Sequence, residues 1–87
     1  MQFADIKFEP LYDGVQAMVP IGPYELSIVK HKMSYGGKMG LYEIAVMKDN
    51  EQIELRGITE PNDTVKGFLK EDDVLKIIDQ MKGIDYA

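Results

Sequence analysis

The amino-acid sequence predicts an α+β fold: an antiparallel sheet of four to five strands with one C-terminal helix packed on one face. Several short segments between residues 3 and 55 alternate apolar and polar residues, which is the pattern of half-buried strands. From residue 74 onward the apolar residues change to the spacing i, i+3, i+4 and i+7. That spacing is typical of the buried stripe of an amphipathic helix.

The N-terminal part of the sheet is predicted from two alternating segments and the turns that bound them. Residues 3–10 alternate, so we expect the first strand there. Tyr12-Asp13-Gly14 is a turn signal, and residues 15–21 form the second predicted strand. Pro20 marks an edge or a strand end, because proline cannot donate a ladder hydrogen bond. Gly22-Pro23 then punctuates the chain before the next strand.

The next two strands are expected at residues 24–32 and 41–48, and a glycine-rich stretch joins them. We interpret this stretch as a hairpin loop of three to five residues with a glycine bulge. Gly36 or Gly37 would supply a positive φ angle at little steric cost. Gly40 would let the strand restart or would form a bulge.

The register of the last predicted hairpin follows from matching its apolar faces. A two-residue loop at Asp49-Asn50 would place Val46 opposite Ile53 and Ile44 opposite Leu55. Both loop residues tolerate the positive φ angles of a type I′ turn. Moving the loop by one residue would break the match between the faces, so we predict the Asp49-Asn50 loop.

The C-terminal helix has acidic residues at its start and a glycine at its end. The segment before it is irregular, with a turn expected at 61–63. The acids at 71–73 suit the positive end of the helix dipole, whereas Lys70 is a poor N-cap residue by preference. Gly83 is expected at the C′ position, where Ile84 could make the contact of a Schellman cap.

These patterns predict one covered and one uncovered face of the sheet. One helix cannot cover both faces, so the apolar residues of the second face form a candidate interface. The predicted core is Ile6, Phe8, Val15, Ala17, Val19, Leu26, Ile28, Tyr42, Ile44, Val46, Ile53, Leu55, Val74, Ile77, Ile78 and Met81. The interface candidates are Met18, Val29, Leu41, Glu43 and Met47.

Composition favours a small globular protein and excludes cysteine chemistry. The chain has 87 residues, which we interpret as one domain over residues 1–87. It contains no cysteine, so disulfides, thiolate zinc sites and cysteine nucleophiles are excluded. No apolar run approaches the roughly 20 residues of a membrane helix. The N-terminal residues lack the pattern of a secretory signal, and we expect a cytoplasmic protein.

The charge is negative overall but unevenly distributed. The net charge of −5 disfavours non-specific binding to nucleic acid. Residues 24–48 carry four lysines against two glutamates, whereas residues 60–87 carry seven acids against four lysines. This polarity is common among solvated surfaces, and it could also support head-to-tail contacts.

The glycine-rich stretch is the one candidate ligand site in the sequence. It does not match the phosphate-binding pattern G-x-x-x-x-G-K-[ST], and a strand rather than a helix follows it. We therefore favour the hairpin interpretation. The alternative is a nest of backbone N–H groups that binds an anion with the help of a lysine. The candidate residues of this loop are Tyr35, Gly36, Gly37, Lys38 and Gly40.

Other sequence features do not predict a catalytic or metal site. His31 is the single histidine and lies between two lysines. A solvated side chain is expected there, because a catalytic site needs several further groups. No segment has the D-x-D-x-D-G pattern of a calcium loop. We expect no catalytic residues, no cofactor and no metal.

Three blocks of the sequence resemble a family of small hypothetical proteins from tailed-bacteriophage and prophage genomes. The blocks are "GVQAMVP", "YELSIVKHKMSYGGKMGLYEIAVMKD" and "DTVKGFLKEDDVLKII". The most specific part is "SYGG" followed, after two or three residues, by "GLYE". In that family Thr or Ser usually begins the helix, where this chain has Lys70. The resemblance implies an accessory protein in an infected bacterium and no known activity.

We therefore expect a small non-enzymatic phage or prophage accessory protein that acts through a protein partner or as a homodimer. Two alternatives remain open. One is an enzyme or binder of a small anionic ligand that uses the loop from Tyr35 to Lys38. The other is a weak nucleic-acid-binding module that uses the lysines near Tyr35, although the net charge makes nucleic acid an unfavourable partner.

Overall fold

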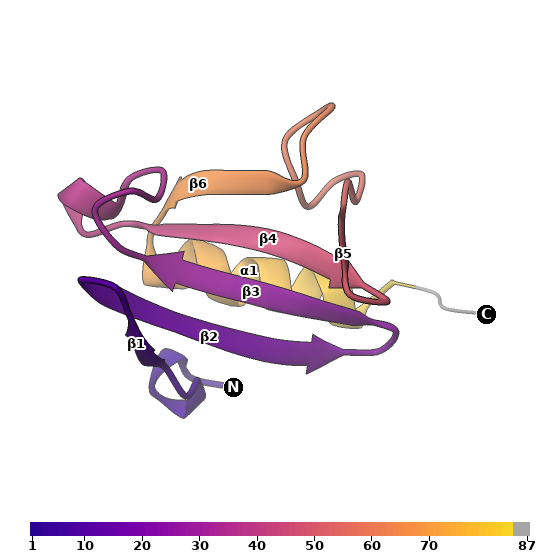
Figure 1. The fold of residues 1–87 in the computed structure, drawn as a ribbon. Coiled ribbons are helices and arrows are strands. Elements are labelled where there is room, and N and C mark those ends of the chain that lie inside the picture. The colour runs from indigo at the N-terminus through magenta and orange to yellow at the C-terminus, as the bar shows by residue number, and fades with distance from the viewer. Residues whose placement is uncertain (85–87) are drawn as a thin grey trace.

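One antiparallel sheet with a helix packed behind it forms the protein (Figure 1). The computed structural model describes residues 1–84. This arrangement confirms the predicted α+β fold. The strands are β1 (Glu9–Leu11), β2 (Gly14–Ile21), β3 (Tyr24–Lys30), β4 (Tyr42–Lys48), β5 (Glu51–Ile53) and β6 (Val65–Leu69). The helices are the 3-10 turns η1 (Phe3–Asp5) and η2 (Gly37–Met39) and the α-helix α1 (Glu71–Lys82).

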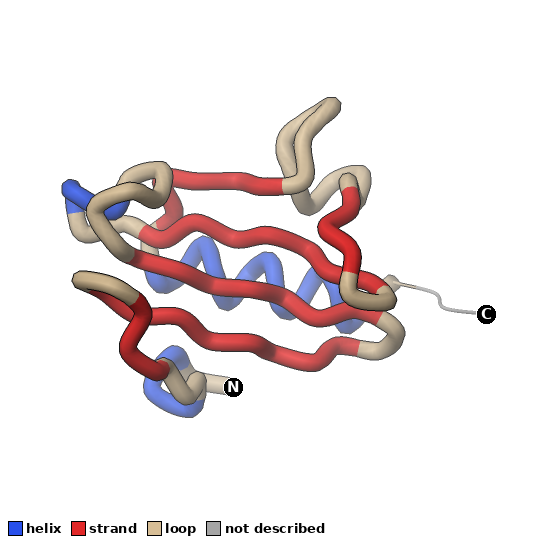
Figure 2. The backbone as a smooth tube through the Cα atoms, in the orientation of Figure 1, coloured by secondary structure: helices blue, strands red, loops and turns tan. Residues whose placement is uncertain are grey.

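Two short strands, β5 and β6, pair with the same edge of β4. The order in the sheet is β1-β2-β3-β4-β5, and β6 pairs with β4 as well. β5 pairs with the C-terminal end of β4, and β6 pairs with its N-terminal half. Figure 2 shows β5 turning away from the sheet, so that the loop after it leads back to β6. The two strands therefore use different stretches of the same edge.

Two-residue loops close two of the predicted hairpins. Gly22-Pro23 joins β2 to β3, where Ile21 pairs with Tyr24. Asp49 and Asn50 have φ angles of 53° and 66°, as a type I′ turn requires, and Val46 pairs with Ile53 as predicted.

One predicted strand pairing is wrong. Ile44 does not face Leu55, because β5 ends at Ile53 and β6 takes its place, with Lys66 opposite Ile44.

The predicted strand at residues 3–10 is wrong for its first half. Residues 3–5 form η1, in which the carboxylate Oδ2 of Asp5 accepts the backbone N–H of Gln2 at 2.8 Å. Only Glu9–Leu11 pair with β2. The alternation nevertheless identified buried side chains, because Ile6 is buried. The Phe3 and Phe8 rings stack at 5.6 Å between centroids.

Strand β6 was not predicted at all. Its sequence, Val-Lys-Gly-Phe-Leu, lacks clean alternation and contains a glycine, which weakens a strand pattern. The pairing with β4 is itself irregular, with a register shift opposite Glu43. The residue at that shift, Phe68, has a φ angle of 56°. A bulged strand of this kind leaves no period-two signal in the sequence.

The helix begins and ends close to the predicted residues. Lys70 is its N-cap and lacks a side-chain capping bond, but the carboxylate of Asp73 accepts the Lys70 backbone N–H at 3.0 Å. Gly83 has a φ angle of −85°, so the predicted left-handed Schellman end is wrong. Its N–H instead donates to the carbonyls of Asp79 and Gln80.

The core lies between the sheet and α1, and most of the predicted core residues are buried. Predicted residues nearer the rim are only partly buried: Phe8, Val15, Val19, Ile53 and Leu55. Three buried apolar residues were missing from the predicted core: Ile21, Ile58 and Leu69. Ile58 and Leu69 lie outside the predicted strands, so no alternating pattern assigned them to the core.

Replacing a core isoleucine should destabilise the fold strongly. Ile44 and Ile77 are 0% and 4% exposed, so Ile44→Ala or Ile77→Ala should each lower the free energy of unfolding by about 2–5 kcal/mol. Urea denaturation measures this. Ile53→Ala is the control and should cost less, because Ile53 is only partly buried. Losses below about 0.5 kcal/mol at both core positions would contradict the assigned faces.

Candidate binding surface

The connection between β3 and β4 is longer than predicted. It spans residues 31–41 and contains the short helix η2, so the predicted loop of three to five residues is wrong. Gly36 and Gly40 flank η2 with φ angles of 88° and 76°. The prediction of a positive φ angle at Gly36 or Gly37 is therefore confirmed at Gly36. The loop lies at one end of the sheet beside β6 (Figure 1).

The loop satisfies most of its own backbone groups. The N–H groups of Gly37, Met39, Gly40 and Leu41 all donate to carbonyl oxygens within the loop at 3.0–3.1 Å. The buried Ser34 hydroxyl accepts the His31 N–H at 3.0 Å and donates to the His31 carbonyl at 2.8 Å. An anion-binding nest needs neighbouring free N–H groups, and within residues 35–40 the hydrogen bonds of Tyr35, Gly37, Met39 and Gly40 leave no two neighbouring N–H groups free.

Glu43 holds the loop against the sheet. Its carboxylate Oε1 accepts the backbone N–H of Tyr35 at 2.8 Å. Glu43 was predicted as a charged residue of an interface on the second face of the sheet. Because of this hydrogen bond, a carboxylate of the chain itself already occupies the Tyr35 N–H.

Three glycines let other backbone segments approach this loop closely. A Cβ atom on Gly14 would overlap the Lys30 carbonyl oxygen, and one on Gly37 would overlap the His31 carbonyl oxygen. A Cβ atom on Gly67, in β6, would overlap the Cβ of Tyr35. Any larger residue at these positions would push the loop out of place. Gly37 is thus required for space rather than for a positive φ angle.

Strand β6 is joined to the loop by a backbone hydrogen bond at the point of closest approach. The Phe68 N–H donates to the Tyr35 carbonyl at 3.2 Å. A Cβ atom on Gly36 would lie 3.0 Å from the Phe68 Cα and 3.1 Å from the Leu41 Cβ. Segments far apart in sequence therefore form one packed unit at this end of the sheet.

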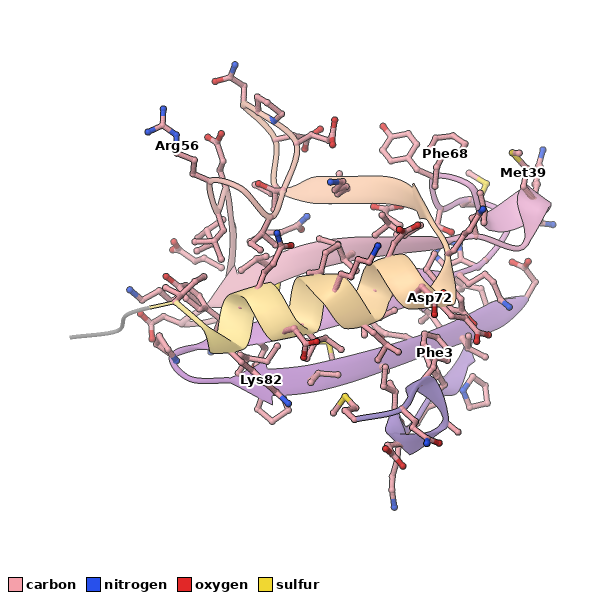
Figure 3. All side chains as sticks on the ribbon, turned by 180° about the vertical axis from the view of Figure 1, so that it is seen from behind. Phe3, Met39, Arg56, Phe68, Asp72 and Lys82 are labelled. Atoms are coloured by element: carbon pink, nitrogen blue, oxygen red, sulfur yellow. The ribbon has the colours of Figure 1, made fainter. Side chains whose placement is uncertain are left out.

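This unit exposes large apolar side chains to solvent. Tyr35 and Phe68 are each 59% exposed, Met39 is 70% exposed and Met33 is 80% exposed. Figure 3 shows Phe68 and Met39 projecting from the same end of the molecule. We call Tyr35, Met39 and Phe68, which line one common groove, the Tyr35–Phe68 surface. Concentrations of exposed apolar residues of this kind mark interaction sites in soluble proteins.

Two open grooves share Tyr35 and Phe68 as walls. The first has a volume of about 440 Å³ and the second a volume of about 320 Å³. We call the first the basic groove; its other lining residues are Lys32, Ser34, Gly36, Lys38 and Met39. We call the second the acidic groove; its other lining residues are Glu60, Asp63, Val65, Lys66 and Gly67.

Phe68 adopts a backbone conformation that its side chain disfavours. Its φ angle of 56° lies in the left-handed region, which costs an L-residue roughly 1–2 kcal/mol relative to glycine. A bulky residue with positive φ is rare, and such strain concentrates at functional sites. The chain retains an aromatic ring at a position where glycine would fit better, and it leaves that ring mostly exposed.

The residues around His31 form a polar border to the loop. His31 Nδ1 accepts the Met33 N–H at 3.2 Å, and the Tyr12 ring packs edge-on against the imidazole at 5.6 Å between centroids. The Lys32 backbone N–H donates to the Asp13 carboxylate at 3.0 Å and lowers the pKa of Asp13. Within residues 1–84, no group of three or more metal-ligating side chains comes together.

The predicted interface residues are divided between two places. Met18, Val29 and Met47 lie on β2, β3 and β4 and face away from α1, on the face that no helix covers in Figure 1. Met18 is 44% exposed. Leu41 instead packs beside Gly36 in the loop. An interface on this face of the sheet stays a prediction.

Sequence reasoning identified Tyr35, Gly36, Gly37 and Lys38 but missed Phe68 and the acidic groove. The fold brings Phe68 beside Tyr35 through β6, which was not predicted. The available signal was the Gly67-Phe68 pair next to an apolar residue. A glycine inside a short apolar run can indicate a bulge or a close backbone approach.

Comparison with known protein families, curated proteins and solved structures finds no match. Separately, no helix within residues 1–84 is long and apolar enough to cross a membrane.

Two replacements of Phe68 should separate the effect of its backbone strain on stability from the effect of losing its ring. Phe68→Ala and Phe68→Gly both remove the ring, but only glycine relieves the positive φ angle. The glycine variant should therefore be more stable than the alanine variant by about 1 kcal/mol. At Lys66, which has an ordinary φ angle in the same strand, alanine should be more stable than glycine. Thermal and urea denaturation of the four variants give the comparison. Equal or reversed stabilities at position 68 would contradict the strained conformation.

Proposed function

We propose that this protein is a small non-enzymatic binding protein that docks its Tyr35–Phe68 surface onto another protein chain. The observation that carries the proposal is Phe68, an aromatic side chain that is 59% exposed on a left-handed backbone. Burying that ring in a complex would be favourable, because moving apolar surface out of water lowers the free energy. The folded monomer leaves the ring mostly exposed and does not obtain this stabilisation.

The composition of the surface fits a protein partner. Tyrosine, phenylalanine and methionine are enriched at the centres of protein interfaces, where charged residues are depleted. The Met39 side chain is flexible and can adapt to the contours of a partner. Lys32 and Lys38 lie at the border, which suits a polar rim.

The tight packing of the loop also favours binding. A surface that is already ordered loses less conformational entropy when it docks. Its internal hydrogen bonds and close glycine contacts hold Tyr35 in place before any partner arrives. The same bonds count against an anionic-ligand site, because they occupy most of the backbone N–H groups such a site would use. Glu60 and Asp63 beside the aromatic rings count against nucleic acid.

The biological setting rests on the sequence resemblance. The "SYGG" and "GLYE" blocks support an accessory protein of a tailed bacteriophage or prophage that works in the cytoplasm of its bacterial host. The "SYGG" block includes Tyr35 and the Gly36-Gly37 pair, and "GLYE" ends at Glu43. The residues that carry the resemblance thus include those that build the proposed binding surface.

Photo-crosslinking in bacterial cells tests this proposal. A photoreactive phenylalanine analogue at position 39 should give a covalent adduct with another protein chain, and Phe68→Gly in the same background should reduce its yield at least severalfold. The same probe at Lys82, which is exposed at the far end of α1 (Figure 3), serves as the control and should give little adduct. Equal adduct yields at the two positions, or yields unaffected by Phe68→Gly, would contradict the proposal.

A further inference from the structure

The two grooves beside the Tyr35–Phe68 surface carry opposite charge. The basic groove has Lys32 and Lys38 and no acidic side chain in its lining. The acidic groove has Glu60 and Asp63 against one lysine, Lys66. The aromatic side chains form the wall between them, so the charge changes sign across an apolar centre.

This order of charges makes the surface complementary to itself. In a dimer whose two-fold axis lies in the interface, each side of the surface meets the opposite side of the partner's surface. The basic groove of one copy would then face the acidic groove of the other, and the same contact would occur twice. The apolar centres of the two copies would meet between these contacts.

We propose that a second copy of this chain occupies the Tyr35–Phe68 surface and forms a two-fold symmetric dimer. This inference rests on the proposed function, because it names the partner of the same surface. Two apolar centres bury each other, and lysines oppose carboxylates at both borders. Apolar contacts alone would not fix the orientation of the two copies relative to each other. The opposite charges at the two borders select one orientation.

The charged borders should affect the affinity moderately. Exposed ion pairs each contribute little, typically a fraction of a kilocalorie per mole. Reversing one charge converts attraction into repulsion, and in a symmetric dimer it does so at two places. We therefore expect a single charge reversal to weaken the dimer by about tenfold.

Charge-reversal variants test the dimer and its symmetry by sedimentation equilibrium. The parent should show a reversible monomer–dimer equilibrium, and Lys38→Glu and Glu60→Lys should each be about tenfold weaker. An equimolar mixture of the two variants should recover the parent affinity, because in the mixed dimer both borders again join opposite charges. Both side chains are exposed, so circular dichroism and thermal denaturation should show unchanged folding.

Matched variants control for net charge. Lys82→Glu and Asp79→Lys make the same changes of charge on exposed positions of α1 and should dimerise as the parent does. A parent that stays monomeric up to millimolar concentration overturns the dimer. If that monomer still crosslinks to a foreign protein through position 39, the binding proposal stands alone. A dimer lost in Met47→Glu but kept in Lys38→Glu would place the contact on the open face of the sheet and overturn this inference.

Discussion

The close approach of β6 to the loop at residues 31–41 is the contact on which the rest of this account depends. It requires glycine at position 67, because a Cβ atom there would overlap the Tyr35 side chain. The same contact includes the hydrogen bond from the Phe68 N–H to the Tyr35 carbonyl. Without it, β6 and the loop would separate, and Tyr35 and Phe68 would no longer share the wall between two grooves.

The core explains why this end of the sheet can hold a strained residue. Leu69, next to Phe68, is buried opposite Tyr42, and α1 begins two residues later. The chain at Phe68 is therefore fixed on one side by the hydrophobic core and on the other by the loop. Packing on both sides can offset the cost of the positive φ angle, as it does where strain persists in folded proteins.

Local rules predicted those parts of the fold that local interactions determine. The Asp49-Asn50 turn and the stripe on α1 follow from short-range preferences, and both were predicted correctly. The conformation of Phe68 depends on Tyr35, which accepts its N–H, and on the irregular pairing of β6 with β4, and both form only in the folded sheet. The prediction for residues 3–5 was wrong for another reason. Their alternation fits a strand, but the Gln2–Asp5 hydrogen bond stabilises a turn. The candidate loop could be predicted because its glycines stand out in the sequence. Strand β6 could not, because its bulged pairing leaves no alternating pattern.

Amide hydrogen exchange tests most directly whether β6 and the loop form one preorganised unit. In the parent, the Phe68 amide, which donates to the Tyr35 carbonyl, and the Tyr35 amide, which donates to the Glu43 carboxylate, should both exchange slowly because both are hydrogen-bonded. Gly67→Ala should remove that protection while leaving the amides of Ala17 and Leu26 protected in the core strands. Gly83→Ala, where an added Cβ meets nothing closer than 3.6 Å, should change neither pair. Fast exchange at Tyr35 and Phe68 in the parent, or unchanged protection in Gly67→Ala, would contradict the account.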